Sequence, residues 1–250
     1  MVCKALIVSL GHKNTFDDCQ KGFYQRRHIC RHSRHNATFQ RDEKRLKKIA
    51  ILGASGHGKV VAEIAELCGY HVTFYDDAWP TEKHLLDWEV VGDSSLLIDG
   101  HSSYDGVFVA IGNNTVRLTK MERLKEAGIK LVSLVHPSAV VSLYAKVGVG
   151  SVIMANTVIG TNAILGEGTI CNTACSVDHD CEIGDCVHIS PGARLAGGVS
   201  VGDMTWIGIG ASVIQQIIIG SNVVVGAGAT VIRDVSDATT VVGSPATLVS

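Results

Sequence analysis

The pattern of apolar and polar positions divides the chain near residue 135. Upstream of that point, short apolar runs at 48–53, 71–77 and 106–112 alternate with stretches whose apolar residues recur at helical spacing. Strands that alternate with helices in this way are typical of a parallel sheet covered by helices. The pattern therefore predicts an α/β, Rossmann-like domain over residues 48–134.

Downstream, the apolar positions follow a period of six. Counting Val135 as position one, seventeen hexads run to Ser236 without an insertion. Position one is Val, Ile or Leu in sixteen hexads, with Cys171 as the exception, and position five always holds a small or β-branched residue. Position four is Gly, Asn or Asp in eleven hexads, and these residues tolerate the left-handed conformation of tight corners. Each hexad is therefore predicted to be a short strand followed by a corner.

Three such hexads would close one coil, so that residues 18 apart stack at the spacing of neighbouring strands, about 4.8 Å. Stacked coils bury one continuous aliphatic core, as in solenoid proteins. We expect a parallel β-helix of hexapeptide repeats over residues 135–236 and a C-terminal tail over residues 237–250.

The loop after the first apolar run, GASGHGK, is rich in glycine. Gly53, Gly56 and Gly58 would let backbone N–H groups approach a ligand at the start of the following helix, where unpaired N–H groups and the helix dipole favour phosphate oxygens. The order of the glycines differs from the dinucleotide fingerprint, and Val60 stands where a P-loop has the Ser or Thr that binds Mg²⁺. The loop therefore predicts binding of a phosphorylated ligand without ATP hydrolysis.

Polar residues follow the next two predicted strands. Asp76 and Asp77 end the second strand, and Gly112, Asn113 and Asn114 end the third. Because the carboxyl ends of parallel strands meet at one edge of a sheet, these loops are expected to converge where open α/β sheets bind ligands. An acid at the end of the second strand is where a Rossmann unit contacts a ribose hydroxyl. The alternative is a Rossmann-like domain kept only for packing.

The charge is distributed unevenly along the chain. Residues 1–48 carry 12 Lys+Arg against 4 Asp+Glu, and the remainder carries 10 against 20. Cys19, Cys30, His28, His32 and His35 of this basic segment are candidate zinc ligands, but their spacing matches no standard zinc module. Because it lacks apolar periodicity, the segment 1–47 is predicted to be a disordered leader or a mis-assigned start rather than a nucleic-acid-binding arm.

A chain of 250 residues is long enough for two modest domains. No apolar run reaches the roughly 18 residues needed to cross a membrane, and the first residues make a poor signal peptide. A cytoplasmic location without membrane contact is therefore expected, and the eight cysteines are interpreted as reduced thiols.

Several motifs carry a family resemblance. They are the hexads, the N-terminal stretches ILGASGHGKVV, YDD and AIGNN, and the tail VVGSPATLV. With them, the chain after about residue 48 resembles the bacterial hexapeptide-repeat sugar acyltransferases of the PglD and NeuD type, which include nucleotide-sugar N-acetyltransferases of the bacillosamine pathway and sialic acid O-acetyltransferases. The resemblance implies a left-handed β-helix, a homotrimer, and acetyl-CoA as co-substrate bound between adjacent subunits.

One segment of the predicted solenoid, SVDHDCEIGDCVHISPGA at 176–193, gathers histidines, aspartates and cysteines. His179 falls on position three, just past a corner, so its side chain is predicted to point away from the core between Asp178 and Asp180. A carboxylate bonded to one ring nitrogen would orient the imidazole and stabilise the imidazolium, and either aspartate could do so. Gly197 lies one coil further on, where its N–H could stabilise an oxyanion without obstruction by a side chain.

The resemblance assigns roles to particular residues. His179 matches the family's catalytic histidine, and Asp180 matches the acid that follows it, which is often Glu in the family. The positions that match the acetyl-CoA site are Asn172, His188 and Gly197. The positions that match the nucleotide-sugar pocket are Gly56, His57, Gly58, Asp76, Asp77, Asn113 and Arg117. Arg233 could meet a coenzyme A phosphate or be a solvated surface charge.

A metal site is the main alternative for the segment around His179. The cysteines that fall on core-facing positions are Cys171, Cys175 and Cys181. Only Cys186 is predicted to look outward. A zinc site would need a third histidine beside His179 and His188, and His136 lies too many coils away. No metal is therefore expected.

The predicted reaction is direct acetyl transfer. His179 would take a proton from the amine of a UDP-linked 4-amino sugar as the amine attacks the acetyl-CoA thioester. Sialic acid O-acetylation and GDP-perosamine N-acetylation are alternatives that these residues do not separate. A non-catalytic trimeric scaffold that binds nucleotide sugars belongs to another class, and an exposed His179 argues against it. Exposed strand edges also predict that the chain associates, as a homotrimer.

Overall fold

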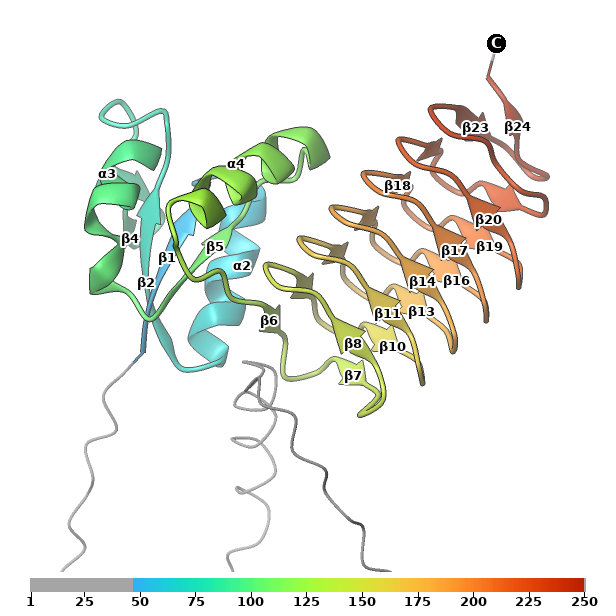
Figure 1. Cartoon of the computed structure of the whole chain (residues 1–250), viewed down its shortest axis with the longest axis horizontal. Coiled ribbons are helices and arrows are strands. Elements are labelled where there is room, and N and C mark those ends of the chain that lie inside the picture. The colour runs from blue at the N-terminus through green and yellow to red at the C-terminus, as the bar shows by residue number, and fades with distance from the viewer. Residues whose placement is uncertain (1–46, 250) are drawn as a thin grey trace, which may run out of the picture.

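A computed structural model describes residues 47–249, which form two domains side by side (Figure 1). The predicted basic leader, with its candidate zinc and nucleic-acid residues, lies almost wholly in residues 1–46, outside the described part of the chain. Within residues 47–249, no helix combines the length and apolar character needed to span a membrane.

The N-terminal domain is built on three parallel strands in the order β2-β1-β5. β1 spans Lys47–Leu52, β2 spans Tyr70–Tyr75 and β5 spans Gly106–Val109. Helix α2, Gly56–Leu67, connects β1 to β2, and helix α4, Asn114–Glu126, follows β5. The smaller elements between β2 and β5 are β3 (His84–Leu85), β4 (Trp88–Glu89), α3 (Ser94–Gly100) and the 3-10 turn η1 (His101–Ser103). The predicted alternation of strands and helices is confirmed.

The sheet explains both the apolar run of β1 and the position of the ligand edge. Ile49 to Leu52 are all buried, because a central parallel strand is covered on both of its faces. In the order β2-β1-β5, the chain leaves the sheet in opposite directions after β1 and after β5. Doubly wound sheets bind ligands at such a switch point, outside the carboxyl ends of the strands.

The C-terminal domain is a parallel β-solenoid with three faces. Each hexad contributes a strand of two residues, at positions six and one of the repeat, and strands 18 residues apart pair in parallel, as Val158 does with Ser176. The face that packs on the N-terminal domain, called the domain face, comprises β6 (Leu134–Val135), β9 (Val152–Ile153), β12 (Ile170–Cys171), β15 (His188–Ile189), β18 (Trp206–Ile207), β21 (Val224–Val225), β23 (Thr240–Val242) and β24 (Thr247–Leu248). The second face comprises β7 (Val140–Val141), β10 (Val158–Ile159), β13 (Ser176–Val177), β16 (Arg194–Leu195), β19 (Ser212–Val213) and β22 (Thr230–Val231). The third face comprises β8 (Lys146–Val147), β11 (Ile164–Leu165), β14 (Glu182–Ile183), β17 (Ser200–Val201) and β20 (Ile218–Ile219).

The core and the corners follow the hexad pattern. One buried cluster runs the length of the solenoid and consists of residues at positions one and five, and it includes Cys171, Cys175 and Cys181 as predicted. Position four adopts the left-handed conformation at the corners, with φ of 58° at Asp180 and 62° at Gly168. The predicted unit of a strand and a corner is therefore confirmed.

The two domains share buried surface. Val152 and Ile170 of the domain face pack in one cluster with Ile49 of β1. The corner between the third face and the domain face, called the α4 corner, packs against α4, where Cys186 lies in one cluster with Met121. Cys186 therefore points out of the solenoid core as predicted, but it is fully buried because α4 covers it.

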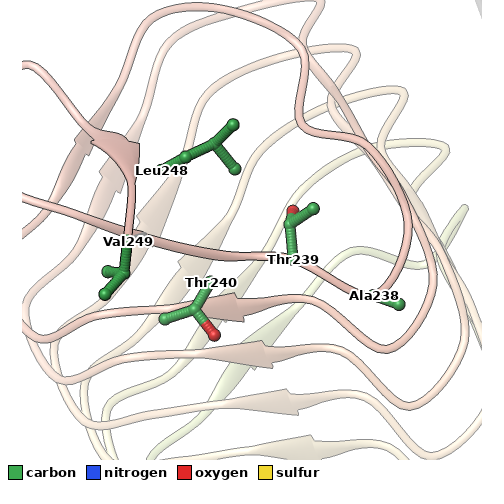
Figure 2. A pocket seen from close by; sticks show the side chains of 5 residues that line it. All are labelled: Ala238, Thr239, Thr240, Leu248 and Val249. Carbon is green, nitrogen blue, oxygen red and sulfur yellow. The ribbon is translucent and has the colours of Figure 1, made fainter.

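The far end of the solenoid holds an open cavity of about 690 Å³ lined by Ala238, Thr239, Thr240, Leu248 and Val249 (Figure 2). It lies beside β23 and β24, at the opposite end of the solenoid from the N-terminal domain (Figure 1). None of its lining side chains can serve as an acid, a base or a charged ligand at neutral pH. The candidate chemistry therefore lies elsewhere.

Candidate functional site

The glycine loop after β1 is shaped by two close backbone approaches. Gly53 has a φ of 115°, and a Cβ there would lie 2.7 Å from the Ala110 carbonyl oxygen. A Cβ on Gly58 would collide with the Gly53 carbonyl oxygen. Gly58 therefore lets α2 pack closely on the loop, and only its N–H can make the predicted contact with a ligand.

The start of α2 presents unpaired backbone donors. Within residues 47–249, the N–H groups of Gly56, His57 and Gly58 have no hydrogen-bond partner, and the side chain of the N-cap Ser55 makes no capping bond. Unpaired N–H groups and the positive end of the helix dipole attract anions such as phosphate. This helix start lies at the switch point of the sheet, where the sequence predicted a phosphorylated ligand.

Asp76 joins the glycine loop to the end of β2. Its Oδ2 accepts a hydrogen bond from the Ala54 N–H at 2.6 Å, and its Oδ1 accepts one from the Ala78 N–H at 2.9 Å. A carboxylate oxygen has a second lone pair, so this arrangement leaves Asp76 able to accept a ligand hydroxyl while it fixes the loop.

Asp77 makes a different set of contacts. It accepts hydrogen bonds from the N–H and Oγ of Ser94 and forms an ion pair with Lys120, whose Nζ lies 2.5 Å from Oδ2. Burial alone would raise the pKa of Asp77, but the bonds from Lys120 and Ser94 outweigh it and lower the pKa to about 2. Asp77 therefore links β2 to α3 and α4, a role that the sequence did not predict.

Asn113 and Arg117 follow β5, and the structure separates their roles. Asn113 is exposed, and its side chain caps α4 by accepting a hydrogen bond from the Val116 N–H at 3.0 Å. Arg117 is fully buried. Its five donors point at protein oxygens, namely Gly168 O, Ile111 O, Gly112 O, Asn114 Oδ1 and Cys186 O, at 2.8 to 3.0 Å. The predicted contact of Arg117 with a nucleotide sugar is therefore wrong, because none of its donors is left for a ligand.

His188 is held in a defined tautomer on the domain face. Asn172 Oδ1 accepts a hydrogen bond from the Thr173 N–H, so the Asn172 Nδ2 donor is the group that faces His188 Nε2, at 3.2 Å. His188 Nε2 must then accept, and the ring proton lies on Nδ1. The ring also stacks against Trp206, with ring centroids 4.2 Å apart. Two predicted coenzyme residues, Asn172 and His188, are thus in direct contact.

His57 of the N-terminal domain and His188 of the solenoid are near enough to interact electrostatically across the domain boundary. Burial and the charge of Arg117 lower the pKa of His57 to about 4. Burial, Arg117 and His57 lower the pKa of His188 to about 3, against a smaller opposing effect of the Gly112 backbone. Both rings are therefore neutral at physiological pH.

These two histidines also supply the unsatisfied polar atoms of the site. Among the described residues, His57 Nε2 and His188 Nδ1 are the buried side-chain nitrogen or oxygen atoms without a hydrogen-bond partner. Buried polar groups in native proteins usually have a protein, water or ligand partner. A residue predicted for the nucleotide sugar and one predicted for acetyl-CoA thus each carry a buried ring nitrogen that has no protein partner.

His179 lies on another corner, between the second and third faces, called the His179 corner. Its side chain is 67% exposed, and its Nδ1 lies 2.8 Å from Asp180 Oδ2. The carboxylate accepts the Nδ1–H, so Nε2 keeps a free lone pair. The sequence left Asp178 and Asp180 as alternative partners, and the structure pairs the imidazole with Asp180.

Asp180 is itself held in place. Asn162, one coil earlier, donates from Nδ2 to Asp180 Oδ1 at 2.8 Å. This bond and the bond to His179 lower the pKa of Asp180, which keeps the carboxylate ionised. The arrangement fixes the imidazole with its free nitrogen toward solvent.

Gly197 stacks directly over the imidazole. A Cβ at this position would lie 2.5 Å from Cε1 and Nε2 of His179, so only glycine leaves room for the ring. In the described part of the chain, the Gly197 N–H donates no hydrogen bond. An imidazole lone pair and an unpaired amide donor therefore lie next to each other, as predicted from the hexad register.

The predicted residues form two clusters on opposite sides of the solenoid. Gly197 and Arg233 stand on the His179 corner, with exposed Arg233 three coils beyond His179, about 14 Å at strand spacing. Asn172 and His188 lie on the domain side with the glycine loop. In a three-sided coil, the His179 corner is opposite the domain face, and β13 and β14, which flank it, lie away from α4 in Figure 1.

Sequence reasoning missed residues that the coil register could have found. Trp206 and Asn162 each lie 18 residues from a predicted site residue, His188 and Asp180 respectively, and therefore contact it in the next coil. Lys120 gives no such signal, because its contact with Asp77 depends on how α4 crosses the sheet. The histidines and acidic or thiol side chains of residues 47–249 form no group of three that could hold a metal ion.

A hexapeptide β-solenoid that carries an exposed, carboxylate-paired histidine, joined to a Rossmann-like domain, defines the class of hexapeptide-repeat acyltransferases. Comparison with known proteins agrees. Residues 48–124 match the PglD N-terminal domain family, and residues 198–233 match the bacterial transferase hexapeptide (six repeats) family. The chain belongs to the family of bacterial hexapeptide-repeat sugar N-acetyltransferases that have a PglD-type N-terminal domain.

Solved structures and a curated relative support this membership. The acetyltransferase domain of PglB from Neisseria gonorrhoeae FA1090, in complex with acetyl coenzyme A, is 42% identical with a TM-score of 0.78, covering 81% of this chain and 99% of that one. PerB from Caulobacter crescentus, in complex with CoA and GDP-perosamine, is 38% identical with a TM-score of 0.78, covering 82% and 98%. The UDP-N-acetylbacillosamine N-acetyltransferase of Bacillus subtilis (strain 168) is 40% identical over 113 residues, or 44% of this chain. That match spans about half of the Bacillus protein, 52% of its length.

Proposed function

We propose that the protein is an acetyl-CoA-dependent N-acetyltransferase that acetylates the 4-amino group of a nucleotide-linked sugar, with a UDP-linked 4-amino sugar as the first candidate. The observation that carries the proposal is the pairing of His179 with Asp180 beside the unpaired N–H of Gly197. These groups supply a general base and an oxyanion donor within one coil spacing.

In the proposed reaction, the sugar amine attacks the thioester carbonyl carbon and forms the C–N bond. His179 Nε2 takes the proton that the nitrogen loses, and Asp180 stabilises the imidazolium through Nδ1. The Gly197 N–H donates to the oxyanion of the tetrahedral intermediate. Collapse breaks the C–S bond, and the imidazolium returns its proton to the leaving thiolate, giving the acetamido sugar and CoA. No acyl-enzyme is formed.

The N-terminal domain would hold the nucleotide. The amides of Gly56, His57 and Gly58 would contact a phosphate, and Asp76 and Asn113 would contact the sugar or base from neighbouring strand ends. The Bacillus relative is named for a UDP-linked sugar, and PerB was solved with GDP-perosamine. Acetylation of a GDP-linked sugar is therefore the second candidate.

We further propose that the active site is shared between two chains of a homotrimer. Within one chain, the His179 corner is opposite the domain face, on which His188 and the nucleotide pocket lie. The base of one chain can reach the sugar only if it is held by a neighbouring chain. Cyclic symmetry would repeat this arrangement at each interface. The free thiols of the solenoid support a reducing, cytoplasmic location.

Release of CoA thiol from acetyl-CoA tests the activity. UDP-linked and GDP-linked 4-amino sugars would be compared with free sialic acid, whose acetylation would indicate O-acetyl transfer. The expected result is turnover of one nucleotide amino sugar, lost about 10³-fold in His179→Ala and kept in His71→Ala, a control at an exposed histidine on β2. Full activity of His179→Ala would contradict the assigned base, and no turnover with any acceptor would favour a binding scaffold.

Mixed trimers test the shared site. His179→Ala and Asp76→Ala chains are each expected to be nearly inactive alone, because the first lacks the base and the second lacks a side chain proposed to contact the nucleotide sugar. When the two are co-expressed with different tags and purified as mixed assemblies, about a third of the interfaces would combine an intact base with an intact nucleotide pocket. Recovered activity would support the shared site. Mixed trimers that stay inactive would mean that both residues must come from one chain.

A further inference from the structure

Helix α4 buries an unusual stripe against the solenoid. Its buried residues are Asn114, Arg117, Met121 and Leu124, which lie on one face because they are spaced by three and four positions. Two of the four are polar, whereas a helix that packs on a core normally buries an apolar stripe. The polar half of the stripe therefore needs an explanation in the surface that it contacts.

That surface is a column of main-chain carbonyls at the α4 corner. Arg117 donates to the carbonyl oxygens of Gly168 and Cys186, both at 2.8 Å. Asn114 donates to the carbonyl of Met204 at 2.9 Å. These three acceptors all occupy position four of their hexads and follow one another at intervals of 18 residues. Asn114 and Arg117 thus bond to the equivalent carbonyl oxygen, that of position four, in three successive coils.

Met121 of α4 extends these contacts toward the earlier, N-terminal coils of the solenoid. A Cβ at Gly168 would lie 2.6 Å from the Met121 sulfur, and one at Gly150 would lie 2.7 Å from its terminal carbon. Met121 therefore fits over the two glycines of the column. The next positions in the column are Cys186 and Met204, which are larger. The apolar part of α4 accordingly has room only at the coils that contain Gly150 and Gly168.

The turns of α4 can align with the coils of the solenoid because their repeat distances are similar. One turn of an α-helix rises 5.4 Å, and one coil of the solenoid rises about 4.8 Å. Each turn of α4 therefore lies against one coil. A helix laid along a repeating corner could otherwise slip by a whole coil, because every coil presents a similar backbone.

Arg117 also hydrogen-bonds to the loop that precedes α4. Its Nη1 donates to the carbonyls of Ile111 and Gly112, at 2.9 and 3.0 Å. One guanidinium therefore joins two coils of the solenoid to the loop at the carboxyl end of β5. Burial lowers the pKa of Arg117 to about 10, so the side chain stays charged. Leaving any of these donors without an acceptor in another register would be costly for a buried charge.

We propose that Arg117 is a positioning residue that selects a single register of the N-terminal domain on the solenoid, and thereby fixes the distance between the nucleotide pocket and the acetyl-CoA residues Asn172 and His188. The part of this inference that concerns catalysis rests on the proposed function. Arg117 touches neither substrate, and its effect is exerted through the loop of Ile111 and Gly112.

The test compares Arg117→Lys and Arg117→Met with Arg123→Met, which makes the same replacement at an exposed site on the same helix. Lysine keeps the charge but lacks the fork that bridges four carbonyls. In both Arg117 variants, kcat is expected to fall about 100-fold. The dissociation constants of UDP and of acetyl-CoA, measured separately by calorimetry, should change less than about threefold. Arg123→Met should match the wild type.

Assays are run at least 15 degrees below the melting temperature of each variant, so that loss of folded protein does not contribute. A kcat within about threefold of wild type in both Arg117 variants, with only a lowered melting temperature, would overturn the proposal. If Arg117→Met does not fold, Arg117→Lys and Asn114→Ala provide the same comparison, because Asn114 bonds both to Arg117 and to the next coil.

A second readout does not depend on catalysis. Hydrogen exchange followed by mass spectrometry should show faster exchange than in the wild type in peptides covering residues 110–118 and 184–190 of both Arg117 variants. In Arg123→Met, both peptides should exchange at the wild-type rate. If the Arg117 variants exchange faster than the wild type but the wild type acetylates none of the sugars tested, the proposed function is refuted and the register role stands. Unchanged exchange in both segments would refute the register role.

Discussion

The imidazole of His179 lies against the Cα of Gly197, one coil away, so that a Cβ on Gly197 would stand 2.5 Å from two ring atoms. This contact joins the proposed base and the proposed oxyanion donor in one arrangement that needs glycine for reasons of space. The backbone of Gly197 does not have a positive φ, so alanine would fit the chain at this position and collide only with the ring.

Gly197→Ala is therefore expected to rotate the exposed His179 ring and to lower kcat at least 100-fold, while the melting temperature changes little. Steady-state kinetics and a thermal melt would measure the two effects. The same substitution in a His179→Ala background should add almost nothing, because the ring that it displaces is already absent. Equal effects in the two backgrounds would contradict a role that acts through the imidazole.

Asp180 combines a structural and a chemical role, and two substitutions separate them. Its φ of 58° is tolerated by asparagine better than by alanine. Asp180→Asn should keep the corner and the melting temperature but remove the charge that stabilises the imidazolium, lowering kcat about 10- to 100-fold. Asp180→Ala should lower kcat and also the melting temperature. An Asp180→Asn enzyme with wild-type kcat would show that the carboxylate is not needed.

Much of the fold could be predicted from the sequence because the hexad rule is local. Position one, position five and the left-handed position four were assigned from residue type alone, and they placed His179 and Gly197 correctly. The same rule would have placed Trp206 against His188 and Asn162 against Asp180, since both pairs obey the spacing of 18 residues.

The residues at the domain boundary could not be predicted in this way. The family resemblance assigns Arg117 to the nucleotide-sugar pocket, and the hexad register predicts correctly that Cys186 points out of the solenoid core, but neither indicates that both residues are buried. Their burial results from how α4 docks on the solenoid, which no local repeat encodes. Arg117 is buried because it bonds to the carbonyls of Gly168 and Cys186, which lie 51 and 69 residues further along the chain.

The burial of His188 makes stability depend on pH. Its folded pKa of about 3 lies below the value near 6.5 of an unfolded histidine. Between these values the unfolded chain binds a proton that the folded chain does not, so its contribution to stability is complete above pH 6.5 and is lost as the pH falls. At pH 5 this single group should lower the free energy of unfolding by about 2 kcal/mol.

Urea unfolding at pH 7.5 and pH 5.0 would measure this effect in the wild type and in His188→Leu. The loss of unfolding free energy between the two pH values should be smaller in His188→Leu by about 2 kcal/mol. His71→Leu, at an exposed position, should retain the full loss. The same pH dependence in His188→Leu as in the wild type would show that His188 is protonated in the folded state.

Two glycines in position four test whether α4 packs as tightly on the solenoid as its contacts indicate. Gly168 and Gly192 have φ of 62° and 68°, so alanine should strain both backbones similarly, by about 1 kcal/mol. A Cβ at Gly192 would meet no atom within 4 Å, whereas one at Gly168 would lie 2.6 Å from the Met121 sulfur and 2.9 Å from the Cys186 sulfur. Gly168→Ala should therefore cost a further 1 to 3 kcal/mol, roughly the cost of overpacking a core. Equal losses of unfolding free energy in the two variants would mean that α4 yields to the added methyl group. A smaller loss from Gly168→Ala in a Met121→Ala background than in the wild type would identify Met121 as the contact responsible.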